Sequence, residues 1–181
     1  NIVEQNIIYS LKNNILGTYN CIDACIKNNV SNFVLISSDK AVRPTNYMGA
    51  SKRFSELILL YYSRNKINYE NNTNFSSVRF GNVVGSSGSV IPLFEKQIQN
   101  GGPITITDKL ATRFFMSINE AAELVIQASS ISEGGDIFVL DMGKPISIDY
   151  IAKKMISLRN LKLVEKKINN DEIEIMYTGL S

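Results

Sequence analysis

Four consecutive residues, Ser37 to Lys40, are the part of the sequence best suited to chemistry. They read Ser-Ser-Asp-Lys and follow the apolar run 33–36. Polar groups at the carboxyl end of a buried strand are how open α/β sheets build active sites. An adjacent carboxyl and amine can supply a proton donor and a proton acceptor to one substrate. The alternative is an ordinary surface Asp–Lys pair at a strand end.

Met48 and Lys52 form a second candidate group. A Pro-containing segment, 43–46, precedes them, and the apolar periodicity predicts a helix from about Asn46 to Lys66. Residues four apart on a helix point in nearly the same direction, so Met48 and Lys52 should face the space above the strand end. Tyr47 is about 140° from Lys52 around the helix and faces elsewhere. The alternative for Lys52 is a solvated helix lysine.

The composition of the chain excludes several classes of function. The chain has 181 residues, of which 44% are hydrophobic, and its 19 basic and 17 acidic residues give a net charge of +2. This dispersed charge gives no support to a nucleic-acid partner. The sequence contains no histidine. Ser-His and Cys-His nucleophile systems are therefore excluded within the chain, and no metal site is expected because the main zinc ligand is missing.

The two cysteines and the apolar patterning bear on the compartment. Cys21 and Cys25 lie four residues apart, and adjacent turns of one helix seldom support a disulfide. We expect two reduced, half-buried thiols and a cytoplasmic location. No secretory leader and no membrane-spanning run is apparent, so no membrane contact is expected from this chain. Because the chain lacks an initial Met and ends on Thr-Gly-Leu-Ser, we expect a piece of a longer protein.

Strands and helices alternate along the rest of the chain. A long amphipathic helix is predicted over 3–28 with Gly17 inside it, and we expect close packing against a backbone or a cofactor at that glycine. The other expected elements are strands at 33–37, 75–80, 104–107, 137–140 and 173–177, and helices at 90–99, 118–130 and 147–159. This alternation predicts a mainly parallel α/β sheet.

Five motifs carry a resemblance to a known family. They are NNILGTYN at 13–20, SSDKAVRPTNYMGASKR at 37–53, VRFGNVVGSSGSVIPLF at 78–94, TRFFMSINEAAELV at 112–125 and IFVLDMG at 137–143. Together they resemble the extended short-chain dehydrogenase/reductase superfamily, and within it the polysaccharide-biosynthesis (CapD-like) UDP-N-acetylglucosamine 4,6-dehydratases. The resemblance covers essentially the whole chain, and the combination is specific although each piece alone would be weak.

The resemblance implies an internal redox reaction. Hydride leaves C4 of the sugar for a nicotinamide, water is lost across C5–C6, and the hydride returns at C6. By similarity Ser38 hydrogen-bonds the reacting sugar hydroxyl, Asp39 is the acid for the departing 6-hydroxyl, and Lys40 is the base for the C5 proton. Lys52 would contact the nicotinamide ribose. The alternative for Ser38 is to cap the turn.

The same resemblance implies binding residues. The cofactor, NAD or NADP, would be contacted by Lys52, Asn14, Gly17, Phe80 and Gly81. The UDP-sugar would be contacted by Asn82, by Ser87 in the Gly- and Ser-rich loop, and by Arg113 at the diphosphate, where a fork of donors suits the task. The alternatives are a turn asparagine, a flexible loop and a rim salt bridge.

The chain departs from the family pattern at two places. Met48 stands where most members have a tyrosine, and a thioether cannot accept the proton of the C4 hydroxyl. The chain is then either inactive or a member of the family branch that has Met at this position, and the flanking residues favour membership of that branch. In an active enzyme, Ser38, Asp39 or water would accept the proton of the C4 hydroxyl. The sequence also lacks the glycine-rich turn of a dinucleotide fold, so the cofactor-binding loop is expected outside this chain.

We therefore predict an α/β fold with a Rossmann-like, mainly parallel sheet flanked by helices, lacking its N-terminal βαβ portion. We expect residues 1–103 to form the Rossmann-like part, with the catalytic strand, loop and helix. Residues 104–181 should form a small C-terminal substrate-binding part that is interleaved with it, within effectively one domain. The predicted function is an NAD(P)-dependent nucleotide-sugar 4,6-dehydratase, a lyase acting on a UDP-N-acetylhexosamine in capsule or O-antigen synthesis, inactive as this piece alone. A nucleotide-sugar epimerase and a non-catalytic nucleotide-sugar or NAD(P)-binding module are the alternatives. We expect the full protein to form homo-oligomers. If it has N-terminal membrane spans, we expect it at the cytoplasmic face of the inner membrane.

Overall fold

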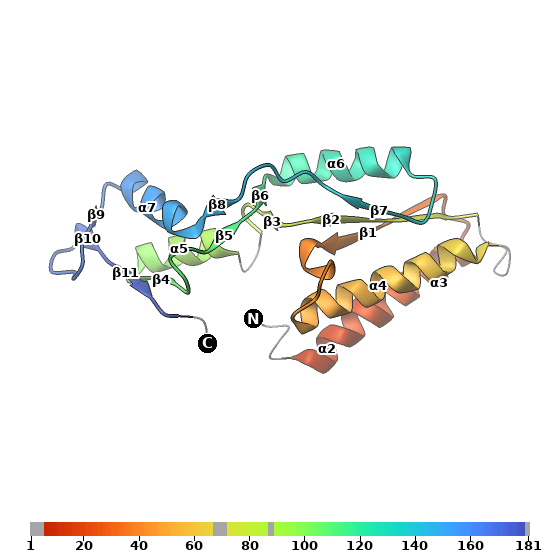
Figure 1. The fold of residues 1–181 in the computed structure, drawn as a ribbon, viewed down its shortest axis with the longest axis horizontal. Coiled ribbons are helices and arrows are strands. Elements are labelled where there is room, and N and C mark those ends of the chain that lie inside the picture. The colour runs from red at the N-terminus through yellow and green to blue at the C-terminus, as the bar shows by residue number, and fades with distance from the viewer. Residues whose placement is uncertain (1–5, 67–71, 87–88, 180–181) are drawn as a thin grey trace. The chain divides into compact units, whose positions relative to one another are not determined.

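The structure of the chain is a computed structural model, and it describes residues 6–66, 72–86 and 89–179 (Figure 1). Parallel strands alternate with helices through these residues, which confirms the predicted α/β class. None of the helices in the described part is long and apolar enough to cross a membrane.

Internal contacts divide the chain into two compact units. The first, named here the sheet unit, comprises 1–81 and 119–141, and the second, the pocket unit, comprises 82–118 and 142–181. The chain therefore leaves the sheet unit after β2 and returns to it for one helix and one strand. The functional division expected at residue 103 stays a prediction.

Three parallel strands in the order β1-β2-β7 form the sheet unit's core layer. They are β1 (Asn32–Ser38), β2 (Asn74–Phe80) and β7 (Asp136–Val139). In the register of β1 and β2, Ser38 is the partner of Phe80. Two strands therefore end side by side, and the polar residues that follow them share one edge of the sheet.

Helices lie on both faces of this sheet (Figure 1). The first face carries α2 (Ile7–Leu11), η1 (Lys12–Leu16), α3 (Gly17–Lys27) and α4 (Tyr47–Arg64), and the other face carries α6 (Ile118–Ile131). The core beneath α3 and α4 consists of Ile22, Leu35, Leu59 and Phe75. Apolar residues at helical spacing therefore bury against the strands, as the sequence predicts.

The predicted long N-terminal helix changes its winding in the middle. Residues 12–16 form a π-helix between α2 and α3. The carbonyl oxygen of Asn14 accepts hydrogen bonds from Thr18 Oγ1 at 2.6 Å and from Ser55 Oγ on α4 at 2.8 Å, and Asn14 Nδ2 donates to Ser51 Oγ at 2.9 Å. The widened turn is thus bonded to α4, and π-turns of this kind are frequent at functional sites.

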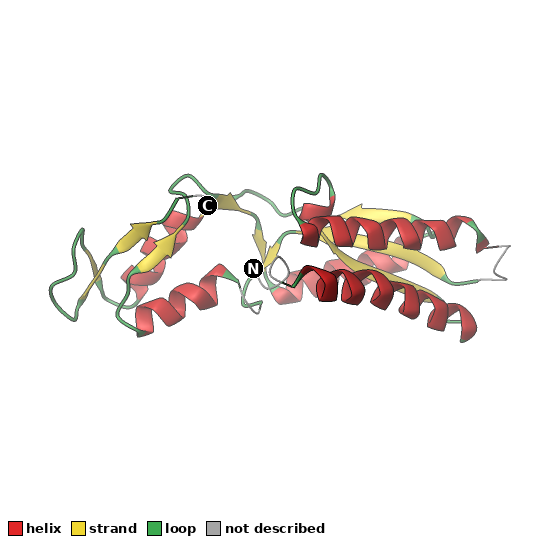
Figure 2. Ribbon diagram, turned by 90° about the horizontal axis from the view of Figure 1, so that it is seen from below, coloured by secondary structure: helices red, strands yellow, loops and turns green. Residues whose placement is uncertain are grey.

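The pocket unit is built from short elements (Figure 2). Its helices are α5 (Val90–Gln99) and α7 (Ile148–Leu158). Its strand pairs are β3 (Asn82–Val83) with β6 (Phe115–Met116), β4 (Ile104–Ile106) with β11 (Ile175–Tyr177), β9 (Lys162–Leu163) with β10 (Glu172–Ile173), all parallel, and antiparallel β5 (Thr112–Arg113) with β8 (Ile146–Ser147). Its core includes Phe94, Ile104, Ile106, Ile156 and Ile173.

Candidate active site

The three residues Ser38, Asp39 and Lys40 form one hydrogen-bonded cluster where β1 ends. A 3₁₀ turn, η2 (Asp39–Ala41), follows the strand at once. Ser38 Oγ accepts from the backbone N–H of Lys40 at 3.3 Å and donates to Asp39 Oδ1 at 2.9 Å. Lys40 Nζ donates to the same carboxylate oxygen at 2.9 Å. The Ser38 hydroxyl therefore caps the turn and also bonds the Asp39 carboxylate.

The electrostatics of this turn favour an ionised Asp39. Partial burial of Asp39 opposes ionisation, but the hydrogen bond and charge of Lys40, with the Ser38 hydroxyl, outweigh it and lower the pKa of Asp39 below its usual value. The Asp39 and Lys40 side chains are 45% and 36% exposed, so the pair is open to a ligand. Asp39 and Lys40 form an ion pair in this structure.

Helix α4 begins in direct contact with the Ser38–Lys40 turn. Asn46 caps the helix, because its side-chain oxygen accepts from the backbone N–H of Gly49 at 2.8 Å. Gly49 is buried, and a Cβ atom there would collide with the carbonyl oxygen of Lys40. Only glycine allows this approach of two backbones. Gly49 is not among the residues predicted from the sequence, where its single sign is a glycine in the first turn of a helix.

Lys52 lies one turn further along α4, at the end of β1. Its Nζ donates to the carbonyl oxygen of Ile36 at 3.1 Å. Burial of the side chain lowers the pKa of Lys52. Met48, one turn earlier, is half-buried. The structure thus brings Lys52 to the strand end that carries Ser38, as the spacing suggests.

A surface pocket of about 350 Å³ in the sheet unit, named here the Gly17 pocket, gathers three of the residues expected to contact a cofactor. They are Asn14, Gly17 and Lys52, and Cys21 also lines it. Apart from its chain neighbours and the backbone of its own helix, no atom of the described residues lies within 4 Å of a Cβ built on Gly17. Packing against another described backbone therefore does not account for this glycine, and its contact with a cofactor stays a prediction. Cys21 is exposed and only Cys25 is partly buried, so the expectation of half-buried thiols holds for Cys25 alone.

The Gly17 pocket has the features that the ribose end of a dinucleotide requires. An open glycine permits close approach of a ligand, and a lysine supplies a donor beside it. Phe80 and Gly81 do not line this pocket; Phe80 ends β2 as the register partner of Ser38, and Gly81 follows it. The residues present therefore fit one end of NAD or NADP, while the sequence contains no glycine-rich loop for its pyrophosphate.

The pocket unit has its own cavity of about 300 Å³, named here the Arg113 pocket. Asn82 and Arg113, two of the residues expected to bind substrate, line it together with Ser89, Thr105 and Thr107. Arg113 is exposed, and its Nη1 donates to the carbonyl oxygen of Thr112 at 2.7 Å. Ser87, also expected here, lies outside the described residues.

Ser89 adds a polar group that the sequence analysis missed. It precedes α5, yet its hydroxyl does not cap that helix, and the buried Oγ has no hydrogen-bond partner among the described residues. A guanidinium group, a helix N-terminus and a buried hydroxyl line the same cavity. Helix N-termini and arginine forks both favour anions, so the Arg113 pocket is suited to a phosphate-bearing ligand.

A second missed feature lies beneath the Ser38–Lys40 turn. Glu56 of α4 is fully buried and bonds Ser37, Arg53 and Arg79, a set named here the Glu56 cluster. Burial would raise the pKa of Glu56, but its hydrogen bonds from Arg79, Ser37 and Arg53 outweigh this and lower it. The available signal was spacing, because Met48, Lys52 and Glu56 repeat at four-residue steps on α4.

Comparisons with known proteins show the family of the chain. The family described as "Polysaccharide biosynthesis protein" matches residues 1–181. The capsular polysaccharide biosynthesis protein CapD of Staphylococcus aureus is 46% identical over 180 residues, which cover 99% of this chain and 28% of CapD. A UDP-N-acetylglucosamine 4,6-dehydratase (inverting) of Campylobacter jejuni is 36% identical over 97% of this chain and 55% of its own length. A UDP-glucose 4-epimerase of Rickettsia rickettsii is 39% identical over 94% of this chain and 49% of its own length.

Solved structures show the same fold. The crystal structure of Pen from Bacillus thuringiensis is 40% identical with a TM-score of 0.88, covering 99% of this chain and 52% of Pen. A dTDP-glucose 4,6-dehydratase from Bacillus anthracis, solved with NAD, has a TM-score of 0.74 at 17% identity over 94% of this chain and 57% of its own, a likeness of fold alone. This chain spans 28% to about half of the lengths of the relatives named here. With a family match over its whole length, the chain belongs to the polysaccharide biosynthesis protein family and has a Rossmann-like fold of the short-chain dehydrogenase/reductase kind.

Proposed function

We propose that the protein containing this chain is an NAD(P)-dependent nucleotide-sugar 4,6-dehydratase acting on a UDP-N-acetylhexosamine in polysaccharide synthesis. The observation that carries the proposal is the Ser38–Asp39–Lys40 cluster at the end of β1, with Lys52 beside it. The name of the Campylobacter relative, a UDP-N-acetylglucosamine 4,6-dehydratase, supports this reaction. Capsular synthesis is supported by the name of the Staphylococcus relative.

In this proposal the Asp39–Lys40 pair carries out the elimination. Lys40 removes the C5 proton of the 4-keto sugar, and Asp39 protonates the departing 6-hydroxyl. Both roles need the uncharged forms, so one proton must pass from Lys40 to Asp39 along their 2.9 Å hydrogen bond. Binding of the sugar removes water from this half-exposed pair, and a drier site favours two neutral partners over two charges.

Lys52 and the Gly17 pocket take the nicotinamide ribose end of the cofactor in this account. NAD or NADP supplies the hydride acceptor when bound. Lys52 keeps a donor at the end of β1, where it bonds the Ile36 carbonyl oxygen. Met48 cannot accept the C4 hydroxyl proton, so Ser38, Asp39 or water takes it, and Ser38 also hydrogen-bonds that hydroxyl.

The pocket unit would bind the nucleotide. Arg113 and the N-terminus of α5 suit the diphosphate, and the Ser89 hydroxyl and Asn82 supply further polar groups. We place Ser87 with them as a prediction from the sequence.

Two alternatives have their own support. A nucleotide-sugar 4-epimerase is supported by the Rickettsia relative, but epimerisation at C4 needs no acid for a leaving water, and so gives Asp39 and Lys40 no task. A non-catalytic module that binds nucleotide sugar or NAD(P) is supported by Met48 in place of tyrosine.

We also expect the full protein to form homo-oligomers. Exposed apolar side chains follow one stripe of α4, at Phe54, Leu57 and Tyr61, and such stripes commonly mark protein interfaces. The cytoplasmic location stays a prediction.

Product analysis tests the proposal. The full-length protein is incubated with UDP-N-acetylglucosamine and NAD, the products are separated, and their masses are measured by mass spectrometry. A product lighter by one water and carrying a ketone supports the dehydratase. A C4 epimer of unchanged mass would support the epimerase instead, and unchanged substrate with retained binding would support the non-catalytic module.

A further inference from the structure

We propose that Glu56 is a positioning residue of this active site: its buried carboxylate joins the ends of β1 and β2 to α4, and so sets where Ser38 and Lys52 lie relative to each other. The inference rests on the proposed function for its catalytic readout. Its structural part concerns the sheet unit alone.

Four hydrogen bonds converge on the Glu56 carboxylate. Ser37 Oγ donates to Oε1 at 2.6 Å, and Arg79 Nε donates to the same oxygen at 2.7 Å. Arg79 Nη2 donates to Oε2 at 2.6 Å, and Arg53 Nη1 donates to Oε2 at 3.0 Å. The Arg79 contact is bidentate, which fixes its direction as well as its distance. Both carboxylate oxygens are therefore satisfied.

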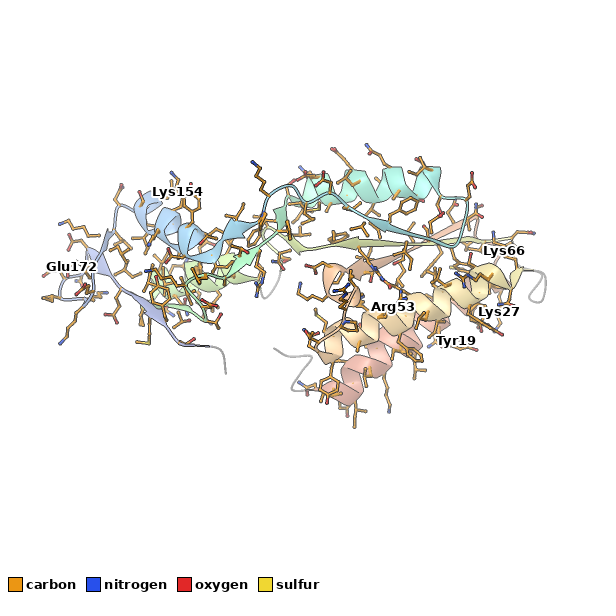
Figure 3. The ribbon with its side chains drawn as sticks, in the orientation of Figure 1. Tyr19, Lys27, Arg53, Lys66, Lys154 and Glu172 are labelled. Carbon is orange, nitrogen blue, oxygen red and sulfur yellow. The ribbon has the colours of Figure 1, made fainter. Side chains whose placement is uncertain are left out.

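These partners come from the elements that carry the candidate catalytic groups. Ser37 directly precedes Ser38, and Arg79 directly precedes Phe80, so the bonded residues are the last-but-one of β1 and of β2. Ser37 and Arg79 are also partners in the strand register. Arg53, labelled in Figure 3, lies on α4 beside Lys52.

Lys52 and Glu56 contact successive residues of β1. Lys52 Nζ donates to the carbonyl oxygen of Ile36, and Glu56 accepts from the side chain of Ser37. Because these α4 residues are four apart, the two bonds fix both the rotation of the helix and its position along the strand. Ser38, the next residue of β1, then begins the turn with Asp39 and Lys40.

Packing alone does not account for a charge at this position. The Glu56 side chain is 0% exposed and Arg79 is 12% exposed. Burying such ions costs desolvation energy, and apolar residues of similar volume often stabilise a fold equally well or better. What an apolar residue cannot do is fix the direction of three neighbouring side chains. This favours a positioning role for Glu56.

The test compares two variants of the full-length protein. Glu56→Gln keeps the shape of the side chain but loses the charge and one acceptor for the arginines. Phe75→Leu is the control, because Phe75 is fully buried in the same unit and belongs to its apolar core. We expect Glu56→Gln to lower kcat for the 4-keto product by about tenfold to a hundredfold, as small misplacements of catalytic groups do. The KM and the kcat of Phe75→Leu should stay close to wild type below the melting temperature.

Backbone hydrogen exchange gives a readout besides activity. In Glu56→Gln, amide exchange should quicken at 36–40 and 79–81 relative to Phe75→Leu, whereas exchange in α6 should be equal in the two variants. Ser37→Ala removes one of the four hydrogen bonds to Glu56 and should quicken exchange in the same segments by a smaller factor. This variant replaces Glu56→Gln in the test if Glu56→Gln does not fold.

The outcomes separate this inference from the proposed function. If wild type makes no dehydrated product, the proposed function fails, and the exchange pattern alone decides the positioning role. Equal loss of kcat in Glu56→Gln and Phe75→Leu, or exchange that quickens equally throughout the sheet unit, would overturn the inference. A kcat loss limited to Glu56→Gln and Ser37→Ala, with local exchange, supports it.

Discussion

The sheet unit and the pocket unit hold their polar residues in different ways. In the sheet unit, Asp39 and Lys40 bond each other, and Lys52 bonds a strand carbonyl. In the pocket unit, Arg113 is exposed and donates to the carbonyl oxygen of its neighbour Thr112, and the Ser89 hydroxyl has no hydrogen-bond partner among the described residues. In the proposed function the first arrangement carries out the proton transfers, whereas the second offers polar groups to a ligand. We therefore expect substitutions in the sheet unit to change kcat and those in the pocket unit to change KM.

The largest effect is expected from Lys40→Ala in the full-length protein. Loss of the proposed base should lower the rate of water loss by about a hundredfold or more, because general acid–base catalysis contributes on that scale. The KM should change little. Lys27→Ala is the matched control, since Lys27 also pairs with an aspartate on the surface of the same unit, at 2.7 Å from Asp23 (Figure 3). Dehydration at the wild-type rate by Lys40→Ala would contradict the roles given to the pair.

Arg113→Ala tests the other side of the comparison. Removing a charged donor from the diphosphate should raise the KM for UDP-sugar by about tenfold to a hundredfold, because such bonds are worth about 1.5–3 kcal/mol. The kcat should fall much less. Arg159→Ala serves as the control, because this exposed arginine of the same unit pairs with Glu95 at 3.2 Å and neither residue lines the pocket. A fall in kcat at unchanged KM for Arg113→Ala would break the division between the units.

Two glycines of the sheet unit should respond in opposite ways to alanine. Gly49→Ala places a Cβ against the Lys40 carbonyl oxygen, and overpacking of this kind costs about 1–3 kcal/mol. Gly17→Ala meets no described atom beyond its own helix backbone and chain neighbours, and should stabilise the helix by about 0.5–1 kcal/mol. Thermal unfolding checks both. Binding of NAD should weaken in Gly17→Ala, and unchanged NAD affinity would remove the Gly17 pocket from the cofactor site.

The smallest effect concerns a surface bond of the pocket unit. The Tyr177 hydroxyl donates to Asp149 at 2.6 Å. This hydrogen bond, with partial burial and the Asp149 charge, raises the pKa of Tyr177 to about 12. The stability it contributes is present below the unfolded pKa of about 10 and is lost as the pH rises toward 12. A phenolate titration near pH 12 in ultraviolet absorbance should disappear in Tyr177→Phe, and an identical titration in both proteins would contradict the assignment.

Periodicity predicted the longer elements of both units well. The helix expected at 90–99 agrees with the observed bounds of α5, and α4 begins after its Asn46 cap as expected. Two-residue strands such as β8 and β9 were missed, because so short a segment has no periodicity to detect. The π-turn at 12–16 was also missed, because the contacts that accompany it are tertiary: Asn14 donates a hydrogen bond to Ser51 and accepts one from Ser55, both on α4.

Part of the candidate site could be predicted, because apolar patterning shows where a strand ends. Strand-end residues such as Ser38 and Lys40 follow an apolar run that can be recognised in the sequence. Glu56 and Ser89 could not be found in that way. A glutamate on a helix is usually solvated, and only the fold shows that β2 brings Arg79 to Glu56 from 23 residues away. Whether a hydroxyl is left unbonded likewise depends on the packed structure.

Transfer of hydrogen within the sugar tests the central claim most directly. The full-length protein is given UDP-N-acetylglucosamine that carries deuterium at C4, with unlabelled NAD, and the product is examined by NMR and mass spectrometry. We predict a 4-keto-6-deoxy sugar that is lighter by one water and has the deuterium at C6. Deuterium retained at C4, in an epimer or in unchanged substrate, would contradict the account.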